Sequence, residues 1–341
     1  MAQMKNNYCF IILFLFMKIS LVFGAEKQLE FSVQPALYAD NNIFEKVHQE
    51  KIQDEYLQLL ICGKYKKNIR SQRFNLQYIG NWQNYQEFSQ ENKIYNRISF
   101  SYINPLKKSF IIFLNVNIYR KDWLQNDRHY TNGYATTGFI IKTQKFHYQV
   151  DLHAGNFIFS YFPEFNNHHV GARTKLTYLK NRFLSFNIAA AGNYYMYQND
   201  FIDRRRYDSN GMLSFGFEYR QNMIFGIDVQ ALHQPSNYDF LVHNSLIISP
   251  YLSTELAGFY IQLLAKYNYK HYLNKIQDNQ ISLVYPDPES NVNNQLFFGM
   301  EREIGKNLSL SGKVMFFSSE YKYQADFYEK LLVGIGMKYD F

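Results

Sequence analysis

The chain has 341 residues and a formal net charge of +7, from 36 lysines and arginines against 29 acidic residues. The basic residues form no concentrated stripe, which excludes the usual pattern of a nucleic-acid-binding protein, and we expect no nucleic-acid partner. The mean hydropathy of −0.37 does not exclude a membrane protein, because only alternate residues of a transmembrane strand face lipid, and the 30 tyrosines and 31 phenylalanines suit the two bilayer interfaces.

The N-terminus has the pattern of a cleaved secretory signal. Lys5 precedes an unbroken apolar run from Phe10 to Met17, and the small residues Gly24 and Ala25 follow. This run is shorter than the roughly 20 apolar residues of a spanning helix, so an uncleaved anchor is the weaker alternative. We expect cleavage after Gly24 rather than after Ala25. The working division is a signal peptide over residues 1–25 and a single transmembrane β-barrel domain over residues 26–341.

Beyond this segment, apolar and polar residues alternate along most of the chain, which predicts β-strands with one apolar face. The clearest alternations begin at Leu29, Phe74, Phe110, Phe146, Val170, Leu184, Leu213, Phe225 and Leu331. Together with weaker segments they make roughly sixteen strands of about 9–13 residues, the length that tilted strands need to cross a bilayer. We therefore predict an all-β fold, a closed antiparallel up-and-down transmembrane β-barrel of about 16 strands, within a range of about 14–18.

Short and long connections alternate along the chain. The short ones are expected at Lys66 to Gln72, Asn104 to Lys108, Lys142 to Lys145, Leu179 to Arg182, Gln221 to Asn222, Thr254 to Ala257 and Ile304 to Asn307. The long ones are expected at Asp40 to Asp54, Asn84 to Asn92, Arg120 to Tyr130, Ser160 to His168, Gln198 to Asn210, His233 to Val242, His271 to Asn291 and Ser318 to Glu329. This order is typical of outer-membrane barrels, with tight periplasmic turns and longer outer loops, whereas Greek-key sandwiches mix connection lengths.

The distribution of charge predicts which face meets lipid. From Lys145 to Ile158 one alternate set of residues carries no charge, and a lysine or arginine facing lipid at mid-depth would cost about 2–4 kcal/mol. The opposite set therefore predicts a water-filled lumen, and a soluble all-β secreted protein is the alternative. The candidate lumen-lining polar residues are Lys145, His147, Asp151, His153, Arg173, Lys175, Glu218, Arg220 and Asp228. We expect no metal site, because His147 and His153 would lie about 20 Å apart at roughly 3.3 Å per residue.

A second basic feature is the outer-loop cluster Arg204, Arg205 and Arg206, which the pattern places inside a long loop. These arginines would face the pore, the phosphates of outer lipopolysaccharide, or only solvent. Cations such as Arg173 and Lys175 in the lumen would favour anionic solutes, since charged rings set pore selectivity.

The C-terminus supplies a family-level signal. Leu331, Val333, Ile335, Met337, Tyr339 and Phe341 alternate with small or polar residues. The sequence resembles the C-terminal assembly signal of bacterial outer-membrane β-barrels through Gly336, Tyr339 and the terminal Phe341. This resemblance implies export to the bacterial outer membrane, contact with its lipid and lipopolysaccharide, and recognition by the barrel assembly machinery.

One short motif points to an enzyme. The residues Asp127, Arg128, His129, Tyr130, Thr131, Asn132 and Gly133 resemble the Asp-Arg-x-Tyr-Thr-Asn-Gly stretch of the outer-membrane lipid A 3-O-deacylases. That resemblance implies a polar role for Thr131 beside an Asn-Asp pair and a distant catalytic histidine. In this chain no matching Asn-Asp stands upstream and the histidine is not assigned. The alternative is a polar loop in which Asn132-Gly133 makes a turn.

The N-terminal third resembles the β-barrel porins often associated with exopolysaccharide systems, through the stretch from Gln34 to Phe44 and the hairpin between Tyr85 and Tyr95. We expect a porin-like conduit for small hydrophilic solutes or a surface barrel, without enzymatic activity, cofactor or metal. The alternatives are a non-enzymatic component of polysaccharide export or surface display, and a lipid A deacylase. The transported solute, an open or plugged lumen, and a homotrimeric assembly are left open.

Overall fold

The computed structural model describes residues 29–42, 52–126, 128–200, 202–275, 292–322 and 326–341. The predicted signal peptide over residues 1–25 lies outside these ranges, as do Phe44 of the porin-like stretch and Asp127 of the deacylase-like motif. In the described part of the chain, no helix has the length and apolar content to cross a membrane.

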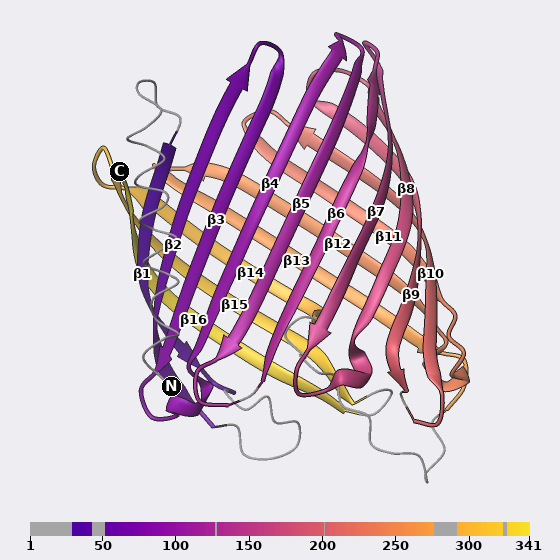
Figure 1. Ribbon diagram of the computed structural model, residues 1–341. Coiled ribbons are helices and arrows are strands. Elements are labelled where there is room, and N and C mark those ends of the chain that lie inside the picture. The colour runs from indigo at the N-terminus through magenta and orange to yellow at the C-terminus, as the bar shows by residue number, and fades with distance from the viewer. Residues whose placement is uncertain (1–28, 43–51, 127, 201, 276–291, 323–325) are drawn as a thin grey trace.

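Nearly all of the described residues belong to strands (Figure 1). The strands are β1 (Leu29–Asp40), β2 (Asp54–Ile69), β3 (Gln72–Tyr85), β4 (Lys93–Lys107), β5 (Phe110–Trp123), β6 (His129–Lys142), β7 (Phe146–Phe159), β8 (Asn167–Leu179), β9 (Leu184–Asp200), β10 (Arg205–Arg220), β11 (Met223–Gln234), β12 (His243–Leu256), β13 (Phe259–Tyr272), β14 (Val292–Glu303), β15 (Leu308–Lys322) and β16 (Asp326–Asp340). Three short 3-10 helices accompany them: η2 (Ser89–Glu91), η3 (Pro163–Phe165) and η4 (Asp239–Leu241).

The strands of the described chain form one closed antiparallel barrel in which each pairs with its neighbours in sequence and β16 returns to β1. The predicted up-and-down barrel of about sixteen strands is therefore confirmed. The strands are longer than predicted, at 12 to 17 residues. The closing ladder between β1 and β16, which we call the seam, joins Val33 to Tyr339 and Ala36 to Gly336 but omits Gln34 and Pro35. Pro35 has no backbone N–H, so it cannot donate to this ladder.

The two ends of the barrel differ. Tight turns close one end, here called the short-turn rim, at the top of Figure 1. The turn between β12 and β13 has Ala257 at φ 52° and Gly258 at φ 76°, the positive values that a two-residue hairpin turn requires. The three 3-10 helices and the longer connections lie at the opposite end, the loop rim.

Three of the predicted outer loops are largely strand. The stretches Arg120 to Tyr130, Gln198 to Asn210 and Ser318 to Glu329 were expected to be loops, but β5 and β6, β9 and β10, and β15 and β16 extend into them. A strand that continues beyond the bilayer needs no apolar face, so its alternation disappears while its hydrogen-bonded ladder persists. Hydropathy patterns therefore place the ends of such strands too early.

Side chains divide between two faces. On β16, Val333, Ile335 and Met337 are exposed on the outer surface, while Gly334 between them is buried. The strand register carries this alternation around the barrel, and the exterior includes Leu152, Leu213 and many other large apolar residues. Among the described strand residues, charged side chains on this outer face occur only within four residues of a strand end, as for Arg120, Asp122 and Arg302. An apolar exterior flanked by charges is what a bilayer requires.

Aromatic pairs on the exterior mark the short-turn rim. Rings of neighbouring strands meet at centroid distances of 5.0 Å for Phe74 and Tyr102 and 5.2 Å for Phe146 and Tyr178. At the seam the terminal Phe341 packs 5.4 Å from Phe31 and its amide donates to the Phe31 carbonyl. Rings with polar tips suit the height of the lipid headgroups.

The loop-rim end of the seam contains a buried ion pair. Lys330 Nζ on β16 lies 2.8 Å from the Asp40 carboxylate on β1, and both side chains are at most 2% exposed. The Tyr85 hydroxyl and the Asn42 amide donate to the same carboxylate, at 3.2 and 3.0 Å. This buried pair joins the first strand to the last.

Removing one partner of this pair should destabilise the barrel. Lys330→Met leaves the buried Asp40 carboxylate without its cation, and we expect a loss of about 3–5 kcal/mol in the free energy of unfolding. Urea unfolding in lipid vesicles, followed by the mobility shift on a cold detergent gel, measures this loss. Lys66→Met is the matched control, because the Lys66–Glu30 pair between β1 and β2 is about half exposed, and there we expect less than about 1 kcal/mol. Equal losses of unfolding free energy in the two variants would contradict the stabilising role of the buried Lys330–Asp40 pair.

Candidate functional site

The inner wall carries most of the charge of the barrel. His147, Gln149, Asp151 and His153 alternate on β7 on the face opposite the exposed Leu152, and Asp151 is buried. The register places Arg173 and Lys175 of β8 beside them, because Asp151 pairs with Arg173 and Gln149 with Lys175.

The other sequence candidates take the same face. Glu218 and Arg220 of β10 and Asp228 of β11 lie inward, as the pairing of Gly216 with Asp228 requires. Lys145 lies in the tight turn before β7, at the short-turn rim. The structure thus brings Asp151 together with Arg173, and Glu218 with Arg220, at 3.0 and 2.7 Å. Asp228 instead accepts a hydrogen bond from Gln230 Nε2, at 2.6 Å.

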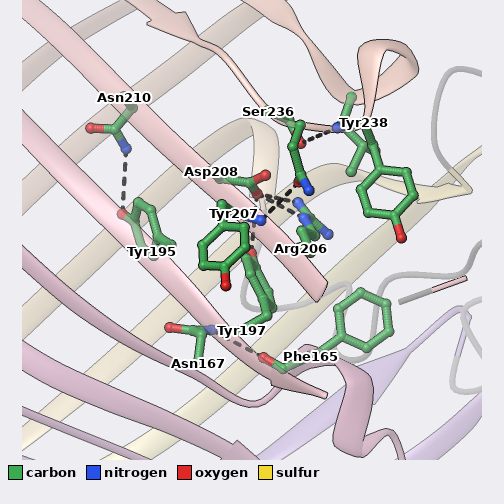
Figure 2. A network of polar contacts seen from close by, with 12 residues as sticks. Phe165, Asn167, Tyr195, Tyr197, Arg206, Tyr207, Asp208, Asn210, Ser236 and Tyr238 are labelled. Carbon is green, nitrogen blue, oxygen red and sulfur yellow. Dashed lines mark hydrogen bonds and ion pairs between the residues drawn. The ribbon is translucent and has the colours of Figure 1, made fainter. Parts of the chain in front are cut away.

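A hydrogen-bonded chain connects this wall to the loop rim. The His153 imidazole contacts the Asn193 carboxamide, Asn193 Nδ2 donates to Asn210 Oδ1 at 2.7 Å, and Asn210 Nδ2 donates to the Tyr195 hydroxyl at 3.3 Å. Figure 2 shows the last of these contacts. Three strands, β7, β9 and β10, supply these residues.

The arginine cluster does not lie in a long loop. Arg204 precedes β10, where its Nη2 donates to the Asn237 carbonyl at 2.7 Å, and Arg205 and Arg206 begin the strand. Arg205 is exposed, whereas Arg206 points inward and is 4% exposed. The predicted loop location is therefore wrong for Arg205 and Arg206, because β10 starts earlier than the hydropathy pattern indicates.

Arg206 and Asp208 form a buried ion pair near the loop rim (Figure 2). Arg206 Nε lies 2.8 Å from Asp208 Oδ2, and the Tyr197 hydroxyl donates to the same oxygen at 3.2 Å. The Arg206 guanidinium also lies 4.5 Å from the centroid of the Tyr197 ring. The two residues stand two apart on one strand, so both point to the same face.

This ion pair borders a cavity of about 460 Å³, which we call the loop-rim cavity. Its wall consists of inward-facing residues of β7 to β13, with Phe165 of η3 and Leu241 of η4. Aromatic rings, amides and charged groups share the lining, including Phe157, Asn167, Tyr195, Tyr197, Gln234, His243, Ser245, Lys266, Asn268, Lys270 and Tyr272. Sequence reasoning missed these residues, because most of them lie near strand ends that lack a clear alternation.

Two acceptor oxygens in the lining have no hydrogen-bond donor among the described residues: Asp208 Oδ1 and Asn268 Oδ1. By contrast, the nearby carboxylate of Glu320 is paired with Lys270 Nζ at 2.8 Å and accepts a hydrogen bond from Tyr272. A buried acceptor without a donor costs about 1–3 kcal/mol. Both oxygens have less than 1 Å² of accessible surface, so a molecule in the cavity does not contact them directly.

Aromatic packing joins the connections above the cavity. Phe165 of η3 packs with Tyr238, Phe240 and Leu241, all buried, and thereby ties the β7–β8 connection to the β11–β12 connection. The Tyr238 hydroxyl lies 2.7 Å from the Arg204 carbonyl and accepts the Arg204 amide at 3.2 Å. Tyr238 therefore holds the connection before β10 in place.

The deacylase-like motif lies mostly in β6. Tyr130 and Asn132 point inward, where Tyr130 is buried and its hydroxyl meets that of Tyr119 at 3.0 Å. Thr131 and Gly133 point outward. Asn132-Gly133 pairs with β5 and β7, so the predicted turn is wrong. Within the described residues the Thr131 hydroxyl makes no hydrogen bond, and Arg128 pairs with Glu91 at 2.6 Å.

The residues of the candidate C-terminal assembly signal lie in and beside the seam. Gly336 faces inward against Ala36, and a Cβ placed on it would lie 2.8 Å from that of Ala36. Tyr339 faces outward and packs 4.7 Å from Phe341. Their role in assembly stays a prediction.

A closed barrel with an apolar exterior, aromatic pairs at one rim and a charged inner wall defines a β-barrel of the outer-membrane type. No protein-family model matches the chain, and no curated protein matches it. Among solved structures, OccAB3 of Acinetobacter baumannii is similar with a TM-score of 0.49 and 10% identity, over 92% of this chain and 98% of the other.

Two further structures are similar over 93% of this chain and 100% of their own. OccK1 (OpdK) of Pseudomonas aeruginosa has a TM-score of 0.49 and 8% identity. A bacterial polysaccharide outer membrane secretin has a TM-score of 0.47 and 9% identity. Likeness at this level is a likeness of fold.

The contacts of Tyr238 give a testable prediction for the loop rim. Tyr238→Phe removes the hydroxyl that anchors Arg204, and at about 1 kcal/mol per hydrogen bond we expect roughly fivefold faster trypsin cleavage after Arg204 and Arg205. Limited proteolysis in detergent, read by mass spectrometry, measures the rate. Tyr207→Phe is the control, because Tyr207 lies on the outer face of the same strand. An unchanged rate in Tyr238→Phe would show that other contacts hold the connection.

Proposed function

We propose that this protein is an outer-membrane channel that lets small hydrophilic solutes pass passively. The observation that carries this proposal is the polarity of the inner wall: on β7 every inward position from His147 to His153 is polar, while the outward positions are not. Such a wall suits water and dissolved solutes, and the opposite face suits lipid.

The orientation follows from the two rims. The short-turn rim would lie in the periplasm, beside the beginning of β1 and the end of β16, and the loop rim would face outward. Lipopolysaccharide would then surround exposed charges of the loop rim such as the Arg120–Asp122 pair, whose atoms lie 2.8 Å apart.

Stepwise conductance tests the channel directly. Purified protein added to planar lipid bilayers should give discrete current steps, because each inserted barrel adds one conducting path. The same recording separates this proposal from its alternatives, since neither lipid A deacylation nor a surface role predicts such steps. Insertion without conductance would remove the channel hypothesis.

The ion pairs of the wall indicate the charge preference. In the Arg173–Asp151 pair the cation is 42% exposed and the acid 3%, and in the Arg220–Glu218 pair the values are 64% and 22%. The carboxylates are thus set in the wall while the guanidinium groups face the lumen. The Lys338–Asp340 pair has the opposite order, since Asp340 is more exposed than Lys338. The exposed guanidinium groups of Arg173 and Arg220 would make the field in the lumen positive, which favours anions.

Anion preference is the expected outcome of a salt-gradient experiment. The reversal potential in a potassium chloride gradient should show chloride passing more readily than potassium, and Arg173→Gln with Arg220→Gln should reduce this preference about twofold or more, because two lumen cations are lost. Arg302→Gln on the lipid-facing side is the control and should leave the potential unchanged. A preference for potassium over chloride in the unmodified channel would contradict the expected anion preference.

A further inference from the structure

An apolar groove, which we call the seam groove, crosses the seam on the outer face of the barrel. Its volume is about 820 Å³, and residues of β13 to β16, β1 and β2 line it together with Ile304. Apart from Arg302 and Ser311, every residue of the lining is apolar or a glycine. The Ser311 hydroxyl already donates to the Gly336 carbonyl at 3.4 Å. Arg302 therefore supplies the charged group of this lining.

The strand register explains the shape of the groove. A row of outward residues crosses the strands, each paired with the next: Met300, Gly312, Ile335, Leu37 and Leu57. Gly312 interrupts this row of large side chains, and a Cβ placed on it would meet no atom within 4 Å. Ala36 and Gly336 also line the groove although they point inward, so the groove reaches down to the backbone of the sheet.

The two ends of the groove differ. Arg302 and Phe259 lie at the short-turn ends of β14 and β13, and the exposed Arg302 guanidinium lies 4.9 Å from the centroid of the Phe259 ring. Among the described residues, no acidic side chain pairs with Arg302. The other end reaches Leu57, which lies near the opposite end of β2. The groove thus leads from a cation at the short-turn rim along a purely apolar wall.

This combination restricts the occupant. A hydrocarbon chain fits the apolar wall but leaves the cation without a partner, and a small dissolved anion leaves the wall uncovered. A molecule with an anionic head and an apolar chain satisfies both parts. A guanidinium group binds phosphate oxygens through paired hydrogen bonds, so a phosphate is a suitable head for Arg302.

We propose that the seam groove binds one anionic phospholipid of the periplasmic leaflet, with an acyl chain in the groove and the phosphate against Arg302. This inference rests on the proposed orientation, with the short-turn rim in the periplasm, but not on the passage of solutes. The acyl chain would cover the junction of the first and last strands where the ladder omits Pro35. The bound lipid would thereby seal the outer side of the seam.

Native mass spectrometry of the full-length protein in detergent is the first test. Phosphatidylglycerol should bind as a single saturable adduct. Diacylglycerol with the same chains lacks the phosphate, and glycerol phosphate lacks the chains, so each should bind at least about fivefold more weakly. Equal binding of phosphatidylglycerol and diacylglycerol would overturn the proposal, and so would a dimer of the chain in place of the lipid adduct.

A variant of Arg302 tests the contact with the phosphate. Arg302→Gln should lower the affinity for phosphatidylglycerol about fivefold, because one cation at the membrane surface is lost, and should leave that for diacylglycerol unchanged. Arg182→Gln is the matched control, since Arg182 also lies over a phenylalanine ring, Phe183, in the short turn between β8 and β9, away from the groove. An equal fall in both variants would indicate only a general attraction of the rim for anionic lipid and would contradict the site.

A variant of Gly312 tests the place of the acyl chain. Gly312→Leu fills the gap in the row, so the affinity for phosphatidylglycerol should fall about threefold or more as packing contacts of the chain are lost. Gly211→Leu is the matched control, because a Cβ on Gly211 also meets no atom within 4 Å and Gly211 lies on the outer face of β10, remote from the groove. Unchanged affinity in Gly312→Leu would overturn the assignment of the groove.

Recordings in planar bilayers separate this inference from the channel proposal. Arg302→Gln and Gly312→Leu alter only the outer face, so both should keep the current steps of the unmodified protein. Current steps without selective lipid binding would leave the channel proposal standing and remove the lipid site. Selective lipid binding without current steps would do the reverse.

Discussion

Closure of the hydrogen-bonded ladder is the constraint on which the structure depends. In hydrocarbon no water satisfies a backbone N–H or C=O group, so every strand edge must find a partner. The chain meets this demand by pairing β16 with β1. The pairing runs from Ser32 opposite Asp340 to Asp40 opposite Leu332. Closure also fixes the two faces, because a strand in a barrel has only an inside and an outside.

The same division of faces decides where the charged side chains of the barrel lie. Charge that is excluded from the exterior collects inside, where acids and bases pair across strands or along one strand. The carboxylates of Asp151, Glu218 and Glu320 lie deeper in the wall than their cationic partners. The formal net charge of the chain therefore says little about the lumen, since what a solute meets depends on which partner of each pair is exposed.

Alternation in the sequence was enough to predict the barrel, its approximate strand number and the exposed apolar residues of strands such as β7 and β16. This works because a bilayer requires a strict apolar face over its thickness. Alternation was not enough near the loop rim, where Arg206 and Asn132 belong to strands that the pattern ended too early. Outside the bilayer neither face of a strand needs to be apolar, so the sequence of the strand there shows no alternation of apolar and polar residues.

The loop-rim cavity was beyond sequence reasoning for a further reason. It joins residues from β7 to β13, and the position of Asn268 relative to Asp208 depends on three intervening strand registers. Pairs such as Lys270 with Glu320 bring together residues 50 positions apart. Parity along one strand predicts the face on which a residue lies, but not its height beside residues on other strands.

The proline in the seam has a consequence for how the barrel comes apart. Pro35 interrupts the ladder between two hydrogen-bonded stretches of the seam. If the seam opened first at this interruption, both strands would still be held on either side, so the chain would gain little conformational entropy. At the loop rim a desolvated lysine–aspartate contact resists fraying, whereas at the opposite rim the exposed Phe341 ends the ladder. Under mechanical load, the first and last strands should therefore separate first at the short-turn rim, beside Phe341, and last at the loop rim.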